Sequence, residues 1–300
     1  MLLSASSAVS TAVALRRRLP LVGRSSLAPS LLAVLAAAMP APAAITWNGG
    51  NGDGDFASAA NWGGTDPDGD LDGVLDDGDL IFAGAVQTSV LIDLDYSGID
   101  SIVFAADADT FTIDGVDGDE VLSFNDAGSI LNNSTVAGDM TFGGNLTLQF
   151  TGGSGVITNN DVDGDSAIVI ASTIDLSGAT RLRIDGAGDV IISGVIGGET
   201  GGLIWEGSGT LTLSGANTYG NGTTLSSGTV LIGDAAAFGT GLVTVDGDTT
   251  LGATGGAVAG VANQLLIGNG VVLTIGGSED LELSGAITGF VGSQLVVDMD

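Results

Sequence analysis

One stretch of the chain, from Trp205 to Val245, restricts the possible folds more than any other. It reads WEGSGTLTLSGANTYGNGTTLSSGTVLIGDAAAFGTGLVTV. Four short segments in it are strand candidates, in which apolar residues tend to alternate with threonine or other polar residues: 209–215, 223–225, 229–232 and 242–246. Such alternation is typical of β-strands, and the glycine, asparagine and serine residues between the segments adopt turn conformations at little cost. Because the stretch lacks the 3.6-residue period of a helix, it predicts short strands joined by tight turns.

Short strands with a glycine-containing turn at each end are typical of a solenoid, whose coils stack and bury one continuous core. GSGTLTLSGANTYGNGTT, followed by SSGTVLIG, resembles the autotransporter-associated β-strand repeat of secreted and surface proteins of Gram-negative-type bacteria. TLTLSGANTY is the specific part of this resemblance, and the clearest repeat lies at 200–246. Members of that family form right-handed parallel β-helices, and many are passengers carried to the cell surface. The resemblance therefore implies an all-β, right-handed parallel β-helix.

We expect the β-helix to occupy residues 89–300, because the same strand-and-turn pattern continues there with less regular spacing. Further strand candidates precede this repeat: 89–94, 101–104, 110–113, 121–124, 145–150, 167–170, 181–184 and 189–192. Inward serine, threonine and asparagine side chains are expected to form ladders between coils. Asn217 fits such a ladder position, and a solvated loop position fits it equally well.

The first 43 residues are predicted to be a secretory signal peptide. They contain four arginines at 16, 17, 18 and 24, an apolar run at 30–39 and the sequence Ala-Pro-Ala at 41–43. A basic segment, a short apolar segment and a small-residue cleavage site in this order are typical of export signals. An amphipathic or membrane-spanning helix is the alternative, but the run is short for a bilayer. We therefore expect a mature chain that starts at about Ala44 and meets the membrane only transiently, during export.

The remainder of the chain is strongly acidic. None of the 36 acidic residues precedes residue 44, and Arg181 and Arg183 are the sole basic residues after it. Such a chain repels nucleic acid and anionic lipid, so we expect no nucleic-acid partner. The sequence has no cysteine and no histidine, which excludes disulfides and thiolate metal sites.

Residues 44–88 are predicted to form an acidic, tryptophan- and aspartate-rich amino-terminal cap region. Trp47 and Trp62 lie in a setting of glycine, asparagine and aspartate. We expect these two side chains to cover the first coil, since isolated aromatic residues usually serve packing. Stacking on sugar rings is the alternative, which would make both tryptophans ligand-binding residues.

The acidic segment Asp68–Asp79, DGDLDGVLDDGD, has the spacing of a twelve-residue calcium loop. Six residues are candidate calcium ligands: Asp68, Asp70, Asp72, Val74 through its carbonyl, Asp76 and Asp79. Two features depart from the pattern, because Asp79 is shorter than the usual bidentate glutamate and the flanking residues predict strand rather than helix. Calcium is the one cofactor that the sequence suggests. A solvated acidic loop between two strands is the alternative.

Catalysis in this chain would depend on carboxylates, hydroxyl groups or the two arginines beyond the signal peptide. Arg181 and Arg183 are two residues apart, hence on one face of a strand, and Asp185 follows on that face. A lyase with an arginine base and a glycosidase with a carboxylate pair would both fit such residues, but so acidic a chain always contains suitable pairs. Local charge neutralisation is the simpler interpretation, and we expect no catalytic residues.

The sequence therefore predicts an exported, non-enzymatic repeat protein of the autotransporter-passenger type, with a structural or display role. It would be secreted or held at the outer cell surface, with cell-surface or extracellular-matrix ligands as partners. A calcium-dependent adhesin or carbohydrate-binding surface protein is the alternative, and a carbohydrate-active β-helix enzyme is a third class. No translocator barrel or sorting signal is recognised in the sequence, so the receptor and the export route stay open.

Overall fold

The computed structural model describes residues 45–50, 52, 54–62, 78–85 and 88–299. Contacts divide the chain into Met1–Met39 and Pro40–Asp300, and every described residue lies in the second unit. Among these residues there is no α-helix, and one short 3-10 helix, η1, spans Ala59–Trp62. We also find no described helix with the length and apolar character needed to cross a membrane. The fold of this unit is all-β.

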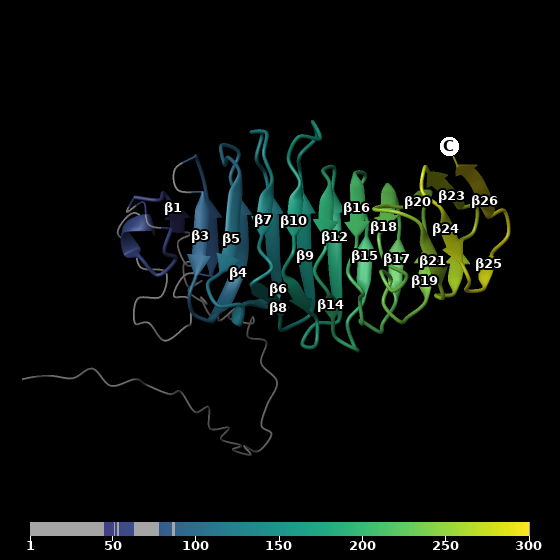
Figure 1. Cartoon of the computed structure of the whole chain (residues 1–300), viewed down its shortest axis with the longest axis horizontal. Helices are drawn as coiled ribbons and strands as arrows, with labels where there is room; N and C mark the ends of the chain where they lie inside the picture. Colours follow the sequence, from purple (N-terminus) through teal and green to yellow (C-terminus); the bar gives the residue numbers. More distant parts are fainter. Residues whose placement is uncertain (1–44, 51, 53, 63–77, 86–87, 300) are drawn as a thin grey trace, which may run out of the picture. The chain divides into compact units, whose positions relative to one another are not determined.

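Two large parallel sheets run along the length of the unit (Figure 1). Among the described residues the first sheet has fourteen strands: in order β1 (Ile45–Trp47), β2 (Asp79–Phe82), β4 (Tyr96–Phe104), β6 (Glu120–Asn132), β9 (Ser154–Asn159), β12 (Arg181–Gly186), β15 (Leu203–Trp205), β17 (Thr223–Leu225), β19 (Val243–Val245), β22 (Leu265–Ile267) and β25 (Ile287–Gly289), with β8 (Leu146–Phe150), β11 (Thr173–Asp175) and β14 (Ile196–Gly197) beside this path.

The second sheet has ten strands within the described part of the chain: β3 (Ser89–Ile92), β5 (Phe111–Gly115), β7 (Met140–Phe142), β10 (Ile168–Ile170), β13 (Val190–Ile192), β16 (Thr210–Leu213), β18 (Thr229–Ile232), β20 (Thr249–Ala253), β23 (Val272–Gly277) and β26 (Gln294–Met299). A small third sheet pairs β21 (Val258–Val261) with β24 (Leu281–Leu283). Every ladder between described strands is parallel. Since the chain alternates between the two large sheets, it forms a parallel β-solenoid of about ten coils, as the sequence predicts.

The core consists of apolar rows that run along the stack. Leu211 pairs with Val190 on one side and with Val230 on the other, and all three side chains are buried. Alternation places Leu211 and Leu213 inside, while Thr210 and Thr212 lie on the outer face. Each coil thus covers the apolar row of the coil before it, and burial by neighbours is the main force that holds the stack together.

The core is rich in aromatic side chains at its amino-terminal end and mostly aliphatic further on. A chain of ring contacts links Trp47 to Phe82, Phe82 to Phe104 and Phe104 to Phe142, with centroids 6.0, 5.6 and 6.1 Å apart. Aromatic rings bury more apolar area than aliphatic side chains, so a few of them fill the first coils. Beyond Phe238, the buried apolar residues that the structure describes are all aliphatic.

Polar ladders lie inside the stack, as predicted. The Asn132 amide nitrogen donates to the Asn159 side-chain oxygen over 3.0 Å, and both residues are fully buried. Asn159 in turn donates to the Ser166 and Asp189 carbonyls, at 2.9 and 2.8 Å. These bonds satisfy amide groups that would otherwise be costly to bury.

Every predicted strand is present, and most of them have shifted ends. The strands expected at 209–215, 223–225, 229–232 and 242–246 are observed as β16, β17, β18 and β19. The expectation for 121–124 was too short, because β6 continues through a bend at Ala127, whose φ is 63°. The right-handed sense of the coil stays an expectation from the family resemblance.

Candidate functional site

The candidate functional unit is the coil formed by β16 and β17, together with β18, which stacks on β16 as the first strand of the next coil. Its inward side chains, Leu211, Leu213, Leu225, Val230 and Ile232, are all buried. The turn before β18 requires glycine, because Gly228 has a φ of 66° and an added Cβ would lie 2.6 Å from the Gly207 carbonyl oxygen. This coil therefore packs closely against the preceding coil.

Asn217 joins three successive coils. Its side-chain oxygen accepts a hydrogen bond from the Ile196 backbone N–H over 2.7 Å, on the preceding coil. Its side-chain nitrogen donates to the Ala237 carbonyl over 2.6 Å, on the following coil. The side chain is 2% exposed, so Asn217 is an internal ladder residue and not a solvated loop residue.

Tyr219 is buried in the same region of the coil, where its hydroxyl group has a hydrogen-bond partner. Its hydroxyl lies 2.8 Å from the Thr223 Oγ1 atom, and Thr223 Oγ1 donates to the Phe238 carbonyl over 3.3 Å. Both side chains are buried, and burial raises the pKa of the Tyr219 hydroxyl above its ordinary value. Tyr219 is therefore neutral at physiological pH and acts as a buried hydrogen-bonding group.

The two predicted cap tryptophans lie in the core of the first coils. Trp47 and Trp62 are 0% and 2% exposed, and their rings meet edge to face with centroids 5.1 Å apart. The Trp62 indole N–H donates to the Phe56 carbonyl over 2.7 Å. Neither ring presents a face to solvent in this structure, so the arrangement is one of packing and offers no platform for a sugar ring.

Most of the predicted calcium loop lies outside the described residues: Asp68, Asp70, Asp72, Val74 and Asp76. Asp79 is described as the first residue of β2, and its carboxylate accepts a hydrogen bond from the Ser101 hydroxyl over 2.7 Å. Within the described ranges, no group of three or more acidic residues is placed to hold a metal ion. Calcium binding at Asp68–Asp79 therefore stays a prediction of the sequence.

We expect calcium to stabilise the amino-terminal end of the mature chain. Bound calcium would remove repulsion among Asp68, Asp70 and Asp72, and stabilisation should reach about 2.7 kcal/mol at a hundredfold excess over Kd. The short Asp79 favours a Kd on the order of 0.1–1 mM. Calorimetry and thermal melting at physiological salt measure both quantities.

The control for calcium binding is the double variant Asp70→Asn with Asp72→Asn. Specific binding predicts that the variant loses both the heat of binding and the melting shift, and that magnesium cannot replace calcium. Equal effects on both proteins, or from both ions, would mean that cations only condense on an acidic chain.

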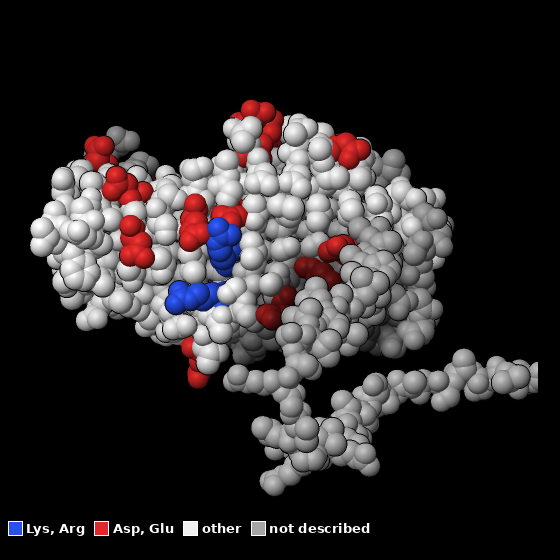
Figure 2. Space-filling view, turned by 180° about the vertical axis from the view of Figure 1, so that it is seen from behind, with Lys and Arg blue, Asp and Glu red and all other residues white. Residues whose placement is uncertain are grey.

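The two described arginines lie on the outer face of the fourteen-stranded sheet, among carboxylates (Figure 2). Arg183 forms ion pairs with Asp185 on its own strand and with Glu206 on the next coil. The hydrogen bond to Glu206 and the charge of Asp185 raise the Arg183 pKa above its ordinary value. A general base must release its proton, so this environment opposes such a role and agrees with local charge neutralisation.

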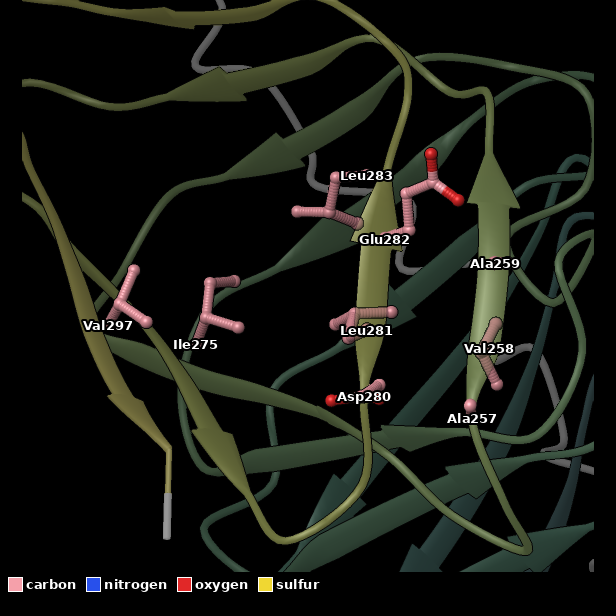
Figure 3. Close-up of a pocket in the computed structure, with 9 residues that line it drawn as sticks. All are labelled: Ala257, Val258, Ala259, Ile275, Asp280, Leu281, Glu282, Leu283 and Val297. Atoms are coloured by element: carbon pink, nitrogen blue, oxygen red, sulfur yellow. The ribbon is translucent and has the colours of Figure 1, made fainter.

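A groove of about 640 Å³ lies beside the carboxy-terminal strands β21, β23, β24 and β26 (Figure 3). Its lining is mostly aliphatic: Ala257, Val258, Ala259, Ile275, Asp280, Leu281, Glu282, Leu283 and Val297. Figure 3 shows the carboxylates of Asp280, just before β24, and of Glu282 on β24 at separate places, where they do not converge on one point. The lining contains no hydroxyl or basic side chain, so the groove offers apolar contact rather than a catalytic constellation.

Comparison with known proteins gives one match. The family model described as passenger-associated-transport-repeat matches residues 206–232, which include β16, β17 and β18 with Asn217 and Tyr219 between them. No curated protein matches the chain. No solved structure matches it either. The chain is thus an all-β parallel solenoid with a match to the passenger-associated-transport-repeat at residues 206–232.

Proposed function

We propose that the chain is exported and acts, without catalysis, as a solenoid that displays loops at the cell surface or in the medium. The observation that supports this most is the repeat match on a coil whose Asn217 side chain joins both neighbouring coils. Such a stack can fold coil by coil after export, because each new coil finds an apolar row and hydrogen-bond partners on the one before it.

Neighbouring loops along one edge of the stack support the display role. The Asn160 side chain donates to the Asn133 side-chain oxygen over 2.8 Å, and the Gly138 N–H donates to the Asp165 carbonyl over 3.0 Å. These bonds hold the loops at 133–139 and 160–166 in parallel layers, and Val162 in the second loop is 79% exposed. A partner at the cell surface or in the extracellular matrix would meet these ordered loops.

The alternative, a carbohydrate-binding or calcium-dependent adhesin, receives less support. Trp47 and Trp62 are buried, so neither ring is free to stack on a sugar. The alternative also requires calcium binding at Asp68–Asp79. The calorimetric experiment described above tests that binding. The display role needs neither feature.

Export predicts a mature amino terminus at about Ala44. The reason is the Ala-Pro-Ala sequence at 41–43 after an apolar run. Mass spectrometry of the protein recovered from the medium or the cell surface should find this terminus. Deleting residues 1–43 should leave the protein inside the cell as a matched control. Recovery of an intact Met1 form from the envelope, or export of the deletion variant, would contradict the proposal.

A further inference from the structure

Glu120 is a glutamate at an inward position of β6. The alternation of this strand turns Glu120, Leu122 and Phe124 to the inside, and Glu120 is 5% exposed. Its register partner on the next coil is Leu146, which is buried as well. A charged carboxylate is costly to bury without partners, so this one depends on the hydrogen bonds that it accepts.

The loop at 116–119, between β5 and β6, folds around this carboxylate. The Glu120 Oε1 atom accepts hydrogen bonds from the Val116 and Asp117 backbone N–H groups, over 3.1 and 2.8 Å. The Oε2 atom accepts one from the Gly118 N–H over 3.0 Å. Successive backbone N–H groups that point at one anion form a nest, and the φ of 93° at Gly118 permits the tight turn. The conformation of the loop is therefore tied to the carboxylate.

Asp161 is the other buried acidic residue in the part of the chain that the structure describes. Its carboxylate also accepts hydrogen bonds from three N–H groups of its own loop, but those from Asp163 and Ser166 are 3.3 Å long. The third, from Gly164, is 2.8 Å long. At Glu120 all three bonds are 3.1 Å or shorter. Of the two carboxylates, Glu120 is therefore the one that holds its loop more tightly.

The charged residues on the segments that pack against Glu120 are all acidic. They lie on its own loop, on β5 and on the turn of the preceding coil, whose Asp95 carboxylate accepts a hydrogen bond from the Val121 N–H: Asp117, Asp119, Asp114, Asp93 and Asp95. On the following coil, residues 143–146 carry no charge. Like charges oppose ionisation. The hydrogen bond from the Asp117 N–H, with those from the rest of the loop, nevertheless holds the pKa of the Glu120 carboxyl below its ordinary value, although burial raises it.

We propose that Glu120 is a pH-dependent switch for the loop at 116–119. While its carboxylate is charged, both oxygens accept hydrogen bonds and the loop stays closed. A proton added in acid converts one oxygen into a hydroxyl group, which brings a donor against the N–H groups of the loop. The remaining bonds lose their charge assistance, which supplies roughly half of their strength, so the loop opens.

The loop closes as the pH rises. Because the Glu120 pKa is lower in the closed loop than in an open loop, where it takes the ordinary value of about 4.3, deprotonation favours the closed loop. This stabilisation is fully present above the ordinary value and is lost as the pH falls through the lower pKa of the closed loop. Val116 in this loop is 50% exposed, so acid would change a surface that faces solvent. The switch acts whether or not the chain is displayed at a cell surface, and its test is independent of the proposed function.

NMR titration of the mature chain tests the switch through the amide protons of Val116, Asp117 and Gly118. We expect all three resonances to shift with one apparent pKa below the ordinary glutamate value, because each proton is bonded to the Glu120 carboxylate. Their protection against hydrogen exchange, corrected for the intrinsic rate at each pH, should fall several-fold over the same range. Amides that do not titrate together, or protection that stays constant, would overturn the proposal.

The variant Glu120→Gln removes the ionisable group and keeps the size of the side chain. Its amide nitrogen is a donor and cannot accept from the loop, so we expect the titration to disappear and the loop to exchange faster at every pH. The matched control is Asp119→Asn, which removes an exposed carboxylate next to Glu120 and should leave the titration unchanged. The titrations of the unaltered chain and of Asp119→Asn decide the question even if Glu120→Gln does not fold. Titration that persists in Glu120→Gln, or that disappears in Asp119→Asn, would assign it to another carboxylate and contradict the proposal.

Discussion

Leu213→Asp should unfold the coils around β16. Leu213 is fully buried between Ile192 and Ile232, which are its ladder partners on the adjacent coils. An aspartate there would carry an unpaired charge into an apolar row, or stay protonated at a high cost in free energy. We expect a loss of more than about 4 kcal/mol in the free energy of unfolding, measured by urea denaturation of the mature chain.

Thr212→Asp is the control for that variant, because Thr212 is next in sequence and lies on the outer face of the same strand. Its cost should be roughly 0.5–1 kcal/mol when it is measured in dilute protein. Both variants introduce aspartate into β16, so the low strand propensity of aspartate affects them equally. The difference between their free energies of unfolding therefore reports whether the substituted side chain faces the core or the outer surface. Equal destabilisation would contradict the observed alternation of the strand.

Asn217→Ala should cost about 2–4 kcal/mol, the second largest effect that we expect. The truncation leaves the Ile196 backbone N–H without its hydrogen-bond acceptor and removes the 2.6 Å donor to the Ala237 carbonyl. Because Asn217 is 2% exposed, water cannot replace both bonds without opening the stack. Urea denaturation measures the loss, and hydrogen exchange should show faster opening at Ile196.

The matched control for Asn217→Ala is Asn221→Ala, which removes the same chemical group from an exposed position on the same coil. We expect that change to lie within about 0.5 kcal/mol of the unaltered protein. A loss at Asn217 no larger than the loss at Asn221 would show that the three-coil connection contributes nothing to stability.

Local strand formation was predictable from the sequence, because alternation and turn residues act within a few positions. Two strands were missed or shortened because their alternating pattern is interrupted, by a glycine in β9 and by a bend in β6. Gly155 weakens the strand pattern of β9, yet glycine is required there because an added Cβ would lie 2.4 Å from the Phe150 ring. The bend in β6 at Ala127 likewise hides the second half of that strand.

The candidate site was predictable in its residues but not in its contacts. The sequence singles out Asn217 as a possible ladder residue, whereas its partners are backbone groups 21 and 20 residues away. Sequence alone does not show them because they depend on the register between coils. Burial of Trp47 depends in the same way on Phe82, which a later strand, β2, contributes.

Thiol labelling of intact cells is the most direct test of a displayed, exported solenoid. In this cysteine-free chain, Val162→Cys places a thiol at a 79% exposed loop position, and Leu213→Cys places one in the core. A membrane-impermeant maleimide should label Val162→Cys on intact cells, and should label Leu213→Cys only after denaturation. Labelling of Val162→Cys only after lysis, or rapid labelling of Leu213→Cys in the folded protein, would contradict the account.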